Sequence, residues 1–151
     1  MRVAIPSNAP GGLEAKRSEH FGHCDIFTVV NLDGKVVTGV ETVDNVGHEA
    51  GGCLVPVKIL QDARVDAIVV AGMGARPMMG FSQAGITVYY ADPNRILDVG
   101  LAVENLTAGN LPIMRSDQAC SYDAFQSVPS ASRTTSRTAL RRLLYICVST
   151  P

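Results

Sequence analysis

The sequence predicts a single α/β domain over residues 1–115, built on a five-stranded mixed sheet with three helices. Two observations predict this class. Short β-branched segments come first in succession and then alternate with segments of helical apolar spacing. Apolar residues make up 46% of the 151-residue chain and charged residues 18%, which is typical of a globular protein with a core.

Three strands are expected before the first helix. Residues 2–6 form a short apolar run, and residues 25–32 are rich in β-branched and aromatic side chains. Asp33-Gly34 is a hairpin signal, so residues 35–43, which alternate Val with other residues, are expected to pair with the strand before them. Together these segments predict an antiparallel meander.

The remainder alternates helices with strands. Apolar spacing predicts a helix over residues 53–63, and the continuous apolar run at 67–71 is typical of a central strand covered on both faces. The same reasoning predicts a helix over 76–84, a strand over 86–90 and a helix over 94–107 with Asn94 as its N-cap. Crossover connections then give the strand order 3-2-1-4-5, with strand 2 antiparallel.

The composition changes after Arg115. Residues 116–151 contain no Gly and no Lys but 7 Ser and 4 Thr, and their charge balance is positive where that of residues 1–115 is negative. We therefore predict a Ser/Thr/Arg-rich, disordered tail over residues 116–151. A basic docking peptide is the alternative to a passive extension.

The net charge, the length of the apolar runs and the cysteine spacing disfavour several classes of function. A net charge of −1 gives no general attraction to nucleic acid or to an anionic membrane, and no apolar run approaches the roughly 18 residues of a membrane span. The chain begins with a strand-like segment rather than a signal peptide, so a cytoplasmic location is expected. The four cysteines contain no C-x-x-C pair, which disfavours a zinc ribbon.

The predicted topology brings the loops together. Strands 1, 3, 4 and 5 run the same way and strand 2 runs oppositely, so four strands end and one begins at a single edge of the sheet. Connections diverge to opposite faces between strands 1 and 4, and open α/β sheets usually bind ligands at such a switch point. A ligand site is therefore expected at this edge.

Three motifs fall on that edge. Ser18-Glu19-His20-Phe21-Gly22-His23-Cys24 offers two imidazoles and a thiol, which are ligands for Cu, Fe or Zn, although alternating side chains allow at most two to reach one metal. The alternative is a purely structural role, in which one His forms a hydrogen bond within the loop and Cys24 packs as a small apolar residue.

The second motif, Asn45–Cys53, contains His48, Gly51 and Gly52, and it places Cys53 at a predicted helix start, where an anion is favoured. A flexible connector explains it equally well. The third, Gly72-Met73-Gly74-Ala75-Arg76-Pro77, joins a buried strand to a helix and resembles a small anion-binding turn with one fixed cation. The structural alternative for Met73 is packing in the core.

Missing residue types narrow the chemistry. The predicted strands at 2–6 and 67–71 carry no carboxylate, whereas two-metal hydrolysis needs several together. A Ser or Cys nucleophile with an oriented His–acid pair cannot be assigned either. We therefore expect a binding protein and not an enzyme.

The three motifs, together with Phe81 and Gly85-Ile86-Thr87-Val88-Tyr89, resemble the dinitrogenase iron–molybdenum cofactor binding family over residues 1–112. This family includes NifX-like proteins, the C-terminal domain of NifB and the orange proteins of sulfate-reducing bacteria, and the short chain looks most similar to the orange proteins. The resemblance implies a ribonuclease H-like fold without nuclease activity. It also implies a non-covalently held ligand, either a molybdenum–copper sulfide cluster or an iron–molybdenum cofactor precursor.

By position, the resemblance implies a set of cluster-binding residues. Many relatives have Arg where this chain has His23. A protonated His23 imidazole would supply part of the positive charge of that Arg. Metal contacts are expected from His20, Cys24 and His48. The full expected site comprises His20, Phe21, Gly22, His23, Cys24, His48, Gly51, Gly52, Cys53, Gly72, Met73, Gly74 and Arg76.

The leading hypothesis is thus a monomeric or weakly dimeric carrier of an anionic metal–sulfur cluster, with a protein donor or acceptor as partner and no nucleic-acid or membrane partner. Two alternatives stay open. One is a regulatory interaction module without a cluster. The other is an enzyme acting on a small anionic metabolite.

Overall fold

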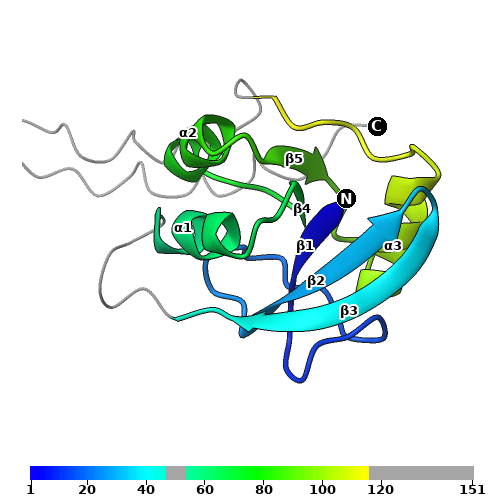
Figure 1. Ribbon diagram of the computed structural model, residues 1–151. Helices are drawn as coiled ribbons and strands as arrows, with labels where there is room; N and C mark the ends of the chain where they lie inside the picture. The colour runs from blue at the N-terminus through cyan, green and yellow to red at the C-terminus, as the bar shows by residue number, and fades with distance from the viewer. Residues whose placement is uncertain (47–53, 116–151) are drawn as a thin grey trace, which may run out of the picture.

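The computed structural model describes residues 1–46 and 54–115. The chain forms a five-stranded sheet with three helices (Figure 1). The elements are β1 (Arg2–Ser7), β2 (Ile26–Asp33), β3 (Val36–Asp44), α1 (Val55–Asp62), β4 (Ala67–Val70), α2 (Ala75–Gln83), β5 (Thr87–Tyr90) and α3 (Val99–Thr107).

The strand order is β3-β2-β1-β4-β5, as the sequence predicts. β2 pairs antiparallel with both β1 and β3, while β1–β4 and β4–β5 are parallel. The central strand β1 is buried on both faces because its alternating side chains enter two different cores. The α/β class, the strand order and the antiparallel β2 are therefore confirmed; the ribonuclease H-like label remains a prediction.

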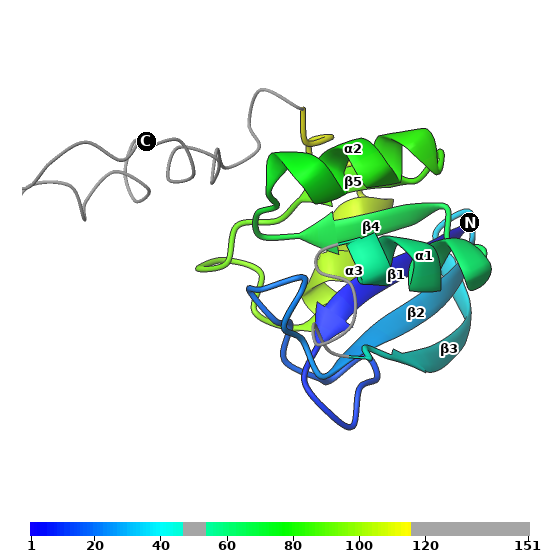
Figure 2. The same ribbon diagram turned by 90° about the vertical axis from the view of Figure 1, so that its left-hand side faces the viewer.

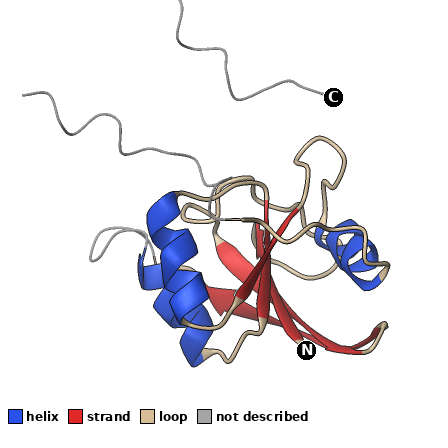
Figure 3. Ribbon diagram, turned by 90° about the horizontal axis from the view of Figure 1, so that it is seen from above, coloured by secondary structure: helices blue, strands red, loops and turns tan. Residues whose placement is uncertain are grey.

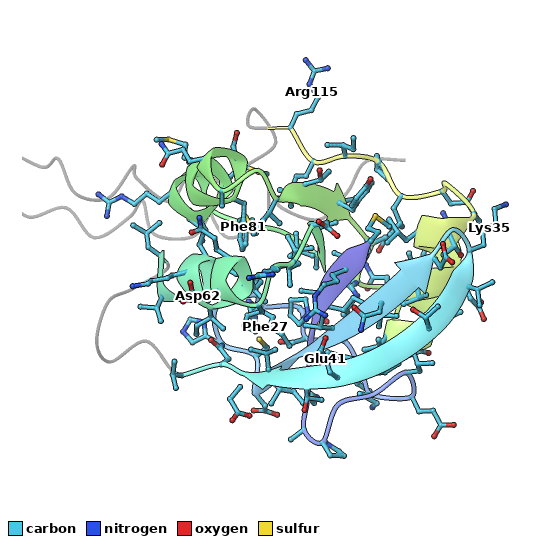
Figure 4. All side chains as sticks on the ribbon, in the orientation of Figure 1. Phe27, Lys35, Glu41, Asp62, Phe81 and Arg115 are labelled. Atoms are coloured by element: carbon cyan, nitrogen blue, oxygen red, sulfur yellow. The ribbon has the colours of Figure 1, made fainter. Side chains whose placement is uncertain are left out.

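Helices cover both faces of the sheet. α1 and α2 lie together on one face and α3 lies on the other (Figure 3). Phe27 of β2 and Phe81 of α2 are fully buried in the core beneath α1 and α2 (Figure 4). A second core, beneath α3, is formed by aliphatic side chains such as Val3 and Val99.

One predicted helix start is wrong. The last helix begins at Val99 rather than Asn94, and its N-cap is Asp98, whose carboxylate accepts a hydrogen bond from the Leu101 amide at 2.7 Å. Residues 92–96 instead form a turn in which Asp92 accepts from the amides of Asn94 and Ile96. Both Asn94 and Asp98 suit an N-cap, and the sequence alone did not distinguish them.

Four strands end and β2 begins at one edge of the sheet, which we call the carboxyl edge. The connection after β1 and the segment after β5 run along this edge side by side (Figure 2). The two backbones are joined where the Arg17 amide donates to the Leu97 carbonyl at 2.9 Å. The segment after β5 is also joined to the end of β4, where the Ala91 amide donates to the Val70 carbonyl at 2.8 Å. The predicted convergence of these loops is confirmed for the described residues.

The outer side of β5 is covered by the segment that follows α3. Tyr90 donates to the carbonyl of Pro112 and Met114 donates to that of Val88, so this segment extends the sheet antiparallel to β5. The predicted tail, residues 116–151, lies outside the described residues, and the domain boundary at Arg115 stays a prediction. No helix within residues 1–46 and 54–115 is long and apolar enough to cross a membrane.

Candidate functional site

The first motif is anchored by its aromatic side chain. Phe21 is 6% exposed, and its ring lies 5.4 Å from that of Phe81 and 6.3 Å from that of Phe27, measured between centroids. Both distances fall in the range of stabilising aromatic pairs. Phe21 therefore fixes the connection between β1 and β2 onto the core beneath α1 and α2.

His20 and His23 flank that anchor at the surface. Both side chains are exposed, and the backbone turns between them because the His23 amide donates to the His20 carbonyl at 3.2 Å. Their ring centroids are 6.4 Å apart and nearly perpendicular. The structure thus brings the two imidazoles close together at the carboxyl edge, while their predicted contacts with a cluster stay predictions.

Cys24 has a different environment. Its side chain is 5% exposed, and its thiol donates to the Phe21 carbonyl at 3.4 Å. Burial raises the pKa of the Cys24 thiol to about 11, despite hydrogen bonds that favour the thiolate. Cys24 is therefore a protonated thiol at neutral pH, so that its predicted role as a metal ligand would require a metal to displace the proton.

Asn45 joins the start of β2 to the end of β3. Its amide nitrogen donates to the carbonyls of Cys24 at 2.9 Å and Gly22 at 3.4 Å. Its Oδ1 atom is buried and has no hydrogen-bond partner within the described residues. Asn45 was not predicted as a site residue, but it holds the first motif against the segment leading to the second.

The turn after β4 is open at its first glycine. A Cβ atom added at Gly72 would meet no atom within 4 Å, and the Gly72 φ angle lies outside the left-handed region. Neither packing nor backbone conformation therefore requires glycine there, in contrast to Gly85, whose φ is +72°. The backbone at Gly72 is left accessible to a ligand.

α2 begins immediately after this turn. Its N-cap is Gly74, and no side chain from the described residues caps its first turn. Pro77 has no N–H, so the amides of Ala75 and Arg76 are the donors at this helix start. The Arg76 side chain is exposed, whereas Met73 is 4% exposed and belongs to the core beneath α1 and α2.

A buried arginine, which no sequence motif indicated, lies at the same edge. Arg17 is 7% exposed; its Nε donates to the Ile96 carbonyl at 3.0 Å and its Nη2 to the Ala91 carbonyl at 3.1 Å. Nη1 is buried without a partner in the part of the chain that the structure describes. Burial lowers the Arg17 pKa, and the nearby acidic groups, Glu19 first, oppose that shift.

Four expected site residues, His48, Gly51, Gly52 and Cys53, lie outside the described residues. Within residues 1–46 and 54–115, no three His, Cys, Asp or Glu side chains are grouped so that they could hold a metal ion. Besides the carboxylates of Glu19 and Asp92, the described edge offers exposed imidazoles, helix amides and two arginines. This chemistry suits an anion held by charge and hydrogen bonds.

The chain is similar to several known proteins. The 98-residue match to "Uncharacterized protein MJ0580" of Methanocaldococcus jannaschii is 26% identical and covers 64% of this chain and 79% of that protein. The solved structure of PH0822 has a TM-score of 0.62 at 26% identity, covering 76% of this chain and 96% of the other. The apo orange protein from Desulfovibrio gigas has the same fold, with a TM-score of 0.66 at 23% identity, over 75% of this chain and 92% of that one.

The family comparison covers most of the described chain. Residues 1–109 match the model of the dinitrogenase iron–molybdenum cofactor family, and this range contains all three motifs. The matched range ends just after α3 and therefore includes every strand and helix of the sheet. The chain belongs to the dinitrogenase iron–molybdenum cofactor family, whose members are of the cofactor-binding or carrier type.

Proposed function

We propose that this protein binds and carries an anionic metal–sulfur cluster, non-covalently, at the carboxyl edge. The cluster is of the molybdenum–copper sulfide or iron–molybdenum cofactor type. The observation that carries the proposal is the open backbone at Gly72, followed by the uncapped start of α2. Together they leave backbone amides that a compact anion can approach closely.

The neighbouring side chains suit such a cargo. Arg76 supplies an exposed positive charge in the first turn of α2, and His20 and His23 lie at the same edge in the connection between β1 and β2. Imidazole suits Cu and Fe as a ligand, and its protonated form suits a sulfide-rich anion as a donor. Cys24 supports this arrangement by packing in the core with Phe21, to whose carbonyl its thiol donates.

A holding role agrees better with these groups than a hydrolytic one. Two-metal hydrolysis requires clustered carboxylates, and within residues 1–46 and 54–115 no three His, Cys, Asp or Glu side chains are grouped to hold a metal ion. A donor or acceptor protein is the partner that a carrier needs, and the exposed position of the two histidines leaves the cargo accessible to it. We accordingly propose a non-enzymatic carrier that works as a monomer or weak dimer.

The test uses the full chain under anaerobic conditions. Tetrathiomolybdate and Cu(I) are titrated into the protein, unbound metal is removed, and bound Mo and Cu are measured by elemental analysis alongside the visible absorption spectrum. We expect retention of both metals and a new visible absorption band. A colourless, metal-free protein after this treatment would contradict the proposal.

Two variants locate the bound cluster. Gly72→Val should fold, because its Cβ meets no atom within 4 Å and the Gly72 φ angle suits any residue, yet it should abolish retention by filling the approach to the backbone. Arg76→Met should weaken retention, while Arg64→Met, which removes the same charge from the exposed turn between α1 and β4, should not. Equal retention by Gly72→Val and the unmodified protein would place the cluster elsewhere.

A further inference from the structure

Arg17 presents a problem of charge balance. The side chain is more than nine-tenths buried, and within residues 1–46 and 54–115 it makes no ion pair; its two hydrogen bonds go to neutral carbonyls. A buried guanidinium remains protonated, and burial of an unpaired charge is costly. The hydrogen bonds to two carbonyls offset only part of the free-energy cost of burying this charge, because Nη1 has no partner among the described residues.

The position of this charge indicates what compensates it. Arg17 pairs with Ser7, the last residue of β1, and its Nη2 bonds to Ala91, which follows β5. The Ala91 amide in turn bonds to the last residue of β4, after which the chain turns toward Gly72. The guanidinium is therefore fixed at the ends of three neighbouring strands, on the carboxyl edge.

The acidic groups that face it are few. The side chains that act on its charge are Glu19, Tyr90 and Asp92, and none forms an ion pair with it. Glu19 is exposed and Asp92 is half-buried, so that solvent screens part of their charge. A fixed positive charge therefore remains at the edge when no ligand is bound.

We propose that Arg17 is a positioning and charge-selecting residue for the anion at this edge. It holds the segment before β2 against residues 91–97, and its buried charge favours ligands that carry two or more negative charges. This inference rests on the proposed function, since it concerns the same edge. It assigns a role to a residue that lies outside the three motifs.

Ligands of equal shape and different charge provide the test. Tetrathiomolybdate is a dianion and tetrathiorhenate a monoanion; both are tetrahedral tetrasulfides. Binding of each to the full chain is measured anaerobically by equilibrium dialysis for the unmodified protein, Arg17→Met, Arg17→Lys and the control Arg64→Met. Thermal unfolding of each variant verifies that it is folded.

Because electrostatic energy scales with ligand charge, the two anions should respond differently. Arg17→Met should weaken the dianion on the order of tenfold and the monoanion on the order of threefold. Arg17→Lys keeps the charge and should preserve the ratio between the two affinities. Arg64→Met should change neither affinity by more than about twofold, because its charge is distant and screened.

Salt gives a second criterion. The contribution of a buried charge is screened little, so the effect of Arg17→Met should persist in about 0.5 M salt, whereas that of Arg76→Met should diminish. If Arg17→Met does not fold, the unmodified protein is followed by ¹⁵N NMR of the arginine side chains. The Arg17 Nε–H signal should then shift on addition of tetrathiomolybdate, and that of Arg64 should not.

The outcomes separate the two proposals. If the unmodified protein binds neither anion, the proposed function fails and the role of Arg17 fails with it. If it binds both, but Arg17→Met weakens the two affinities equally or not at all, then Arg17 only holds the loop backbones together and does not select ligand charge. An unmoved Arg17 Nε–H signal at saturation leads to the same conclusion.

Discussion

Cys24 allows a test of whether the first motif presents a thiol or a thiolate. An unperturbed thiol loses its proton near pH 9.0, but the buried Cys24 thiol keeps it to about pH 11. Between these values the native state binds more protons than the unfolded state. The free energy of unfolding should therefore fall as the pH rises through this window.

The size of the effect follows from the shift. Two pKa units correspond to about 2.7 kcal/mol as an upper value, so the contribution is complete below about pH 8 and lost by about pH 11. Replacing Cys24 with Ala removes this titration. The unmodified protein should then lose roughly 2 kcal/mol relative to Cys24→Ala between pH 8 and pH 11.

The assay is urea unfolding followed by circular dichroism at pH 8, 9, 10 and 11, with reductant present. Titrations of tyrosines, lysines and the other cysteines largely cancel in the difference between the two proteins. Parallel stability curves for the two would refute the reasoning. They would mean that the Cys24 thiolate is accessible without penalty, and its predicted role as a direct metal ligand would gain support.

Two further predictions concern the loops that frame the carboxyl edge. Gly11→Ala should destabilise the protein by roughly 1–3 kcal/mol in urea unfolding, because Gly11 has a φ of +83° and an added Cβ would lie 2.6 Å from Ile26; an unchanged midpoint would contradict this packing. Asp98→Ala should cost about 1 kcal/mol by removing the N-cap of α3, and Asp98→Asn should recover most of it; equal losses in the two variants would argue against the cap.

Much of the fold follows from local patterns. The hairpin at Asp33-Gly34, the apolar run of β4 and the glycines that end α2 and α3 are each encoded by a few neighbouring residues. Right-handed connection rules then leave few ways to assemble the strands. The start of α3 was misplaced because Asn94 and Asp98 have similar capping propensity, and only tertiary contacts of the intervening segment decide between them.

The site was less accessible to sequence reasoning. The first and third motifs lie in loops at the carboxyl edge, but Phe21, Cys24 and Met73 turn their side chains into the core. A short motif shows which residues are near a ligand but not which face of the chain each presents. Those three side chains hold the loops in position, while their predicted contacts with a ligand stay predictions.

Arg17 and Asn45 illustrate a second reason. Each is a polar residue that donates to backbone carbonyls more than twenty residues away. Each also has one buried side-chain atom without a hydrogen-bond partner in the described chain. Burial of such groups depends on how distant loops meet, and no periodicity or spacing records it. An unsatisfied buried polar atom is costly, and an anion bound at the carboxyl edge would satisfy Arg17 Nη1, whereas Asn45 Oδ1 is an acceptor that only a donor can satisfy. Of the two orphaned atoms, the guanidinium nitrogen is therefore the one that supports the proposed anion.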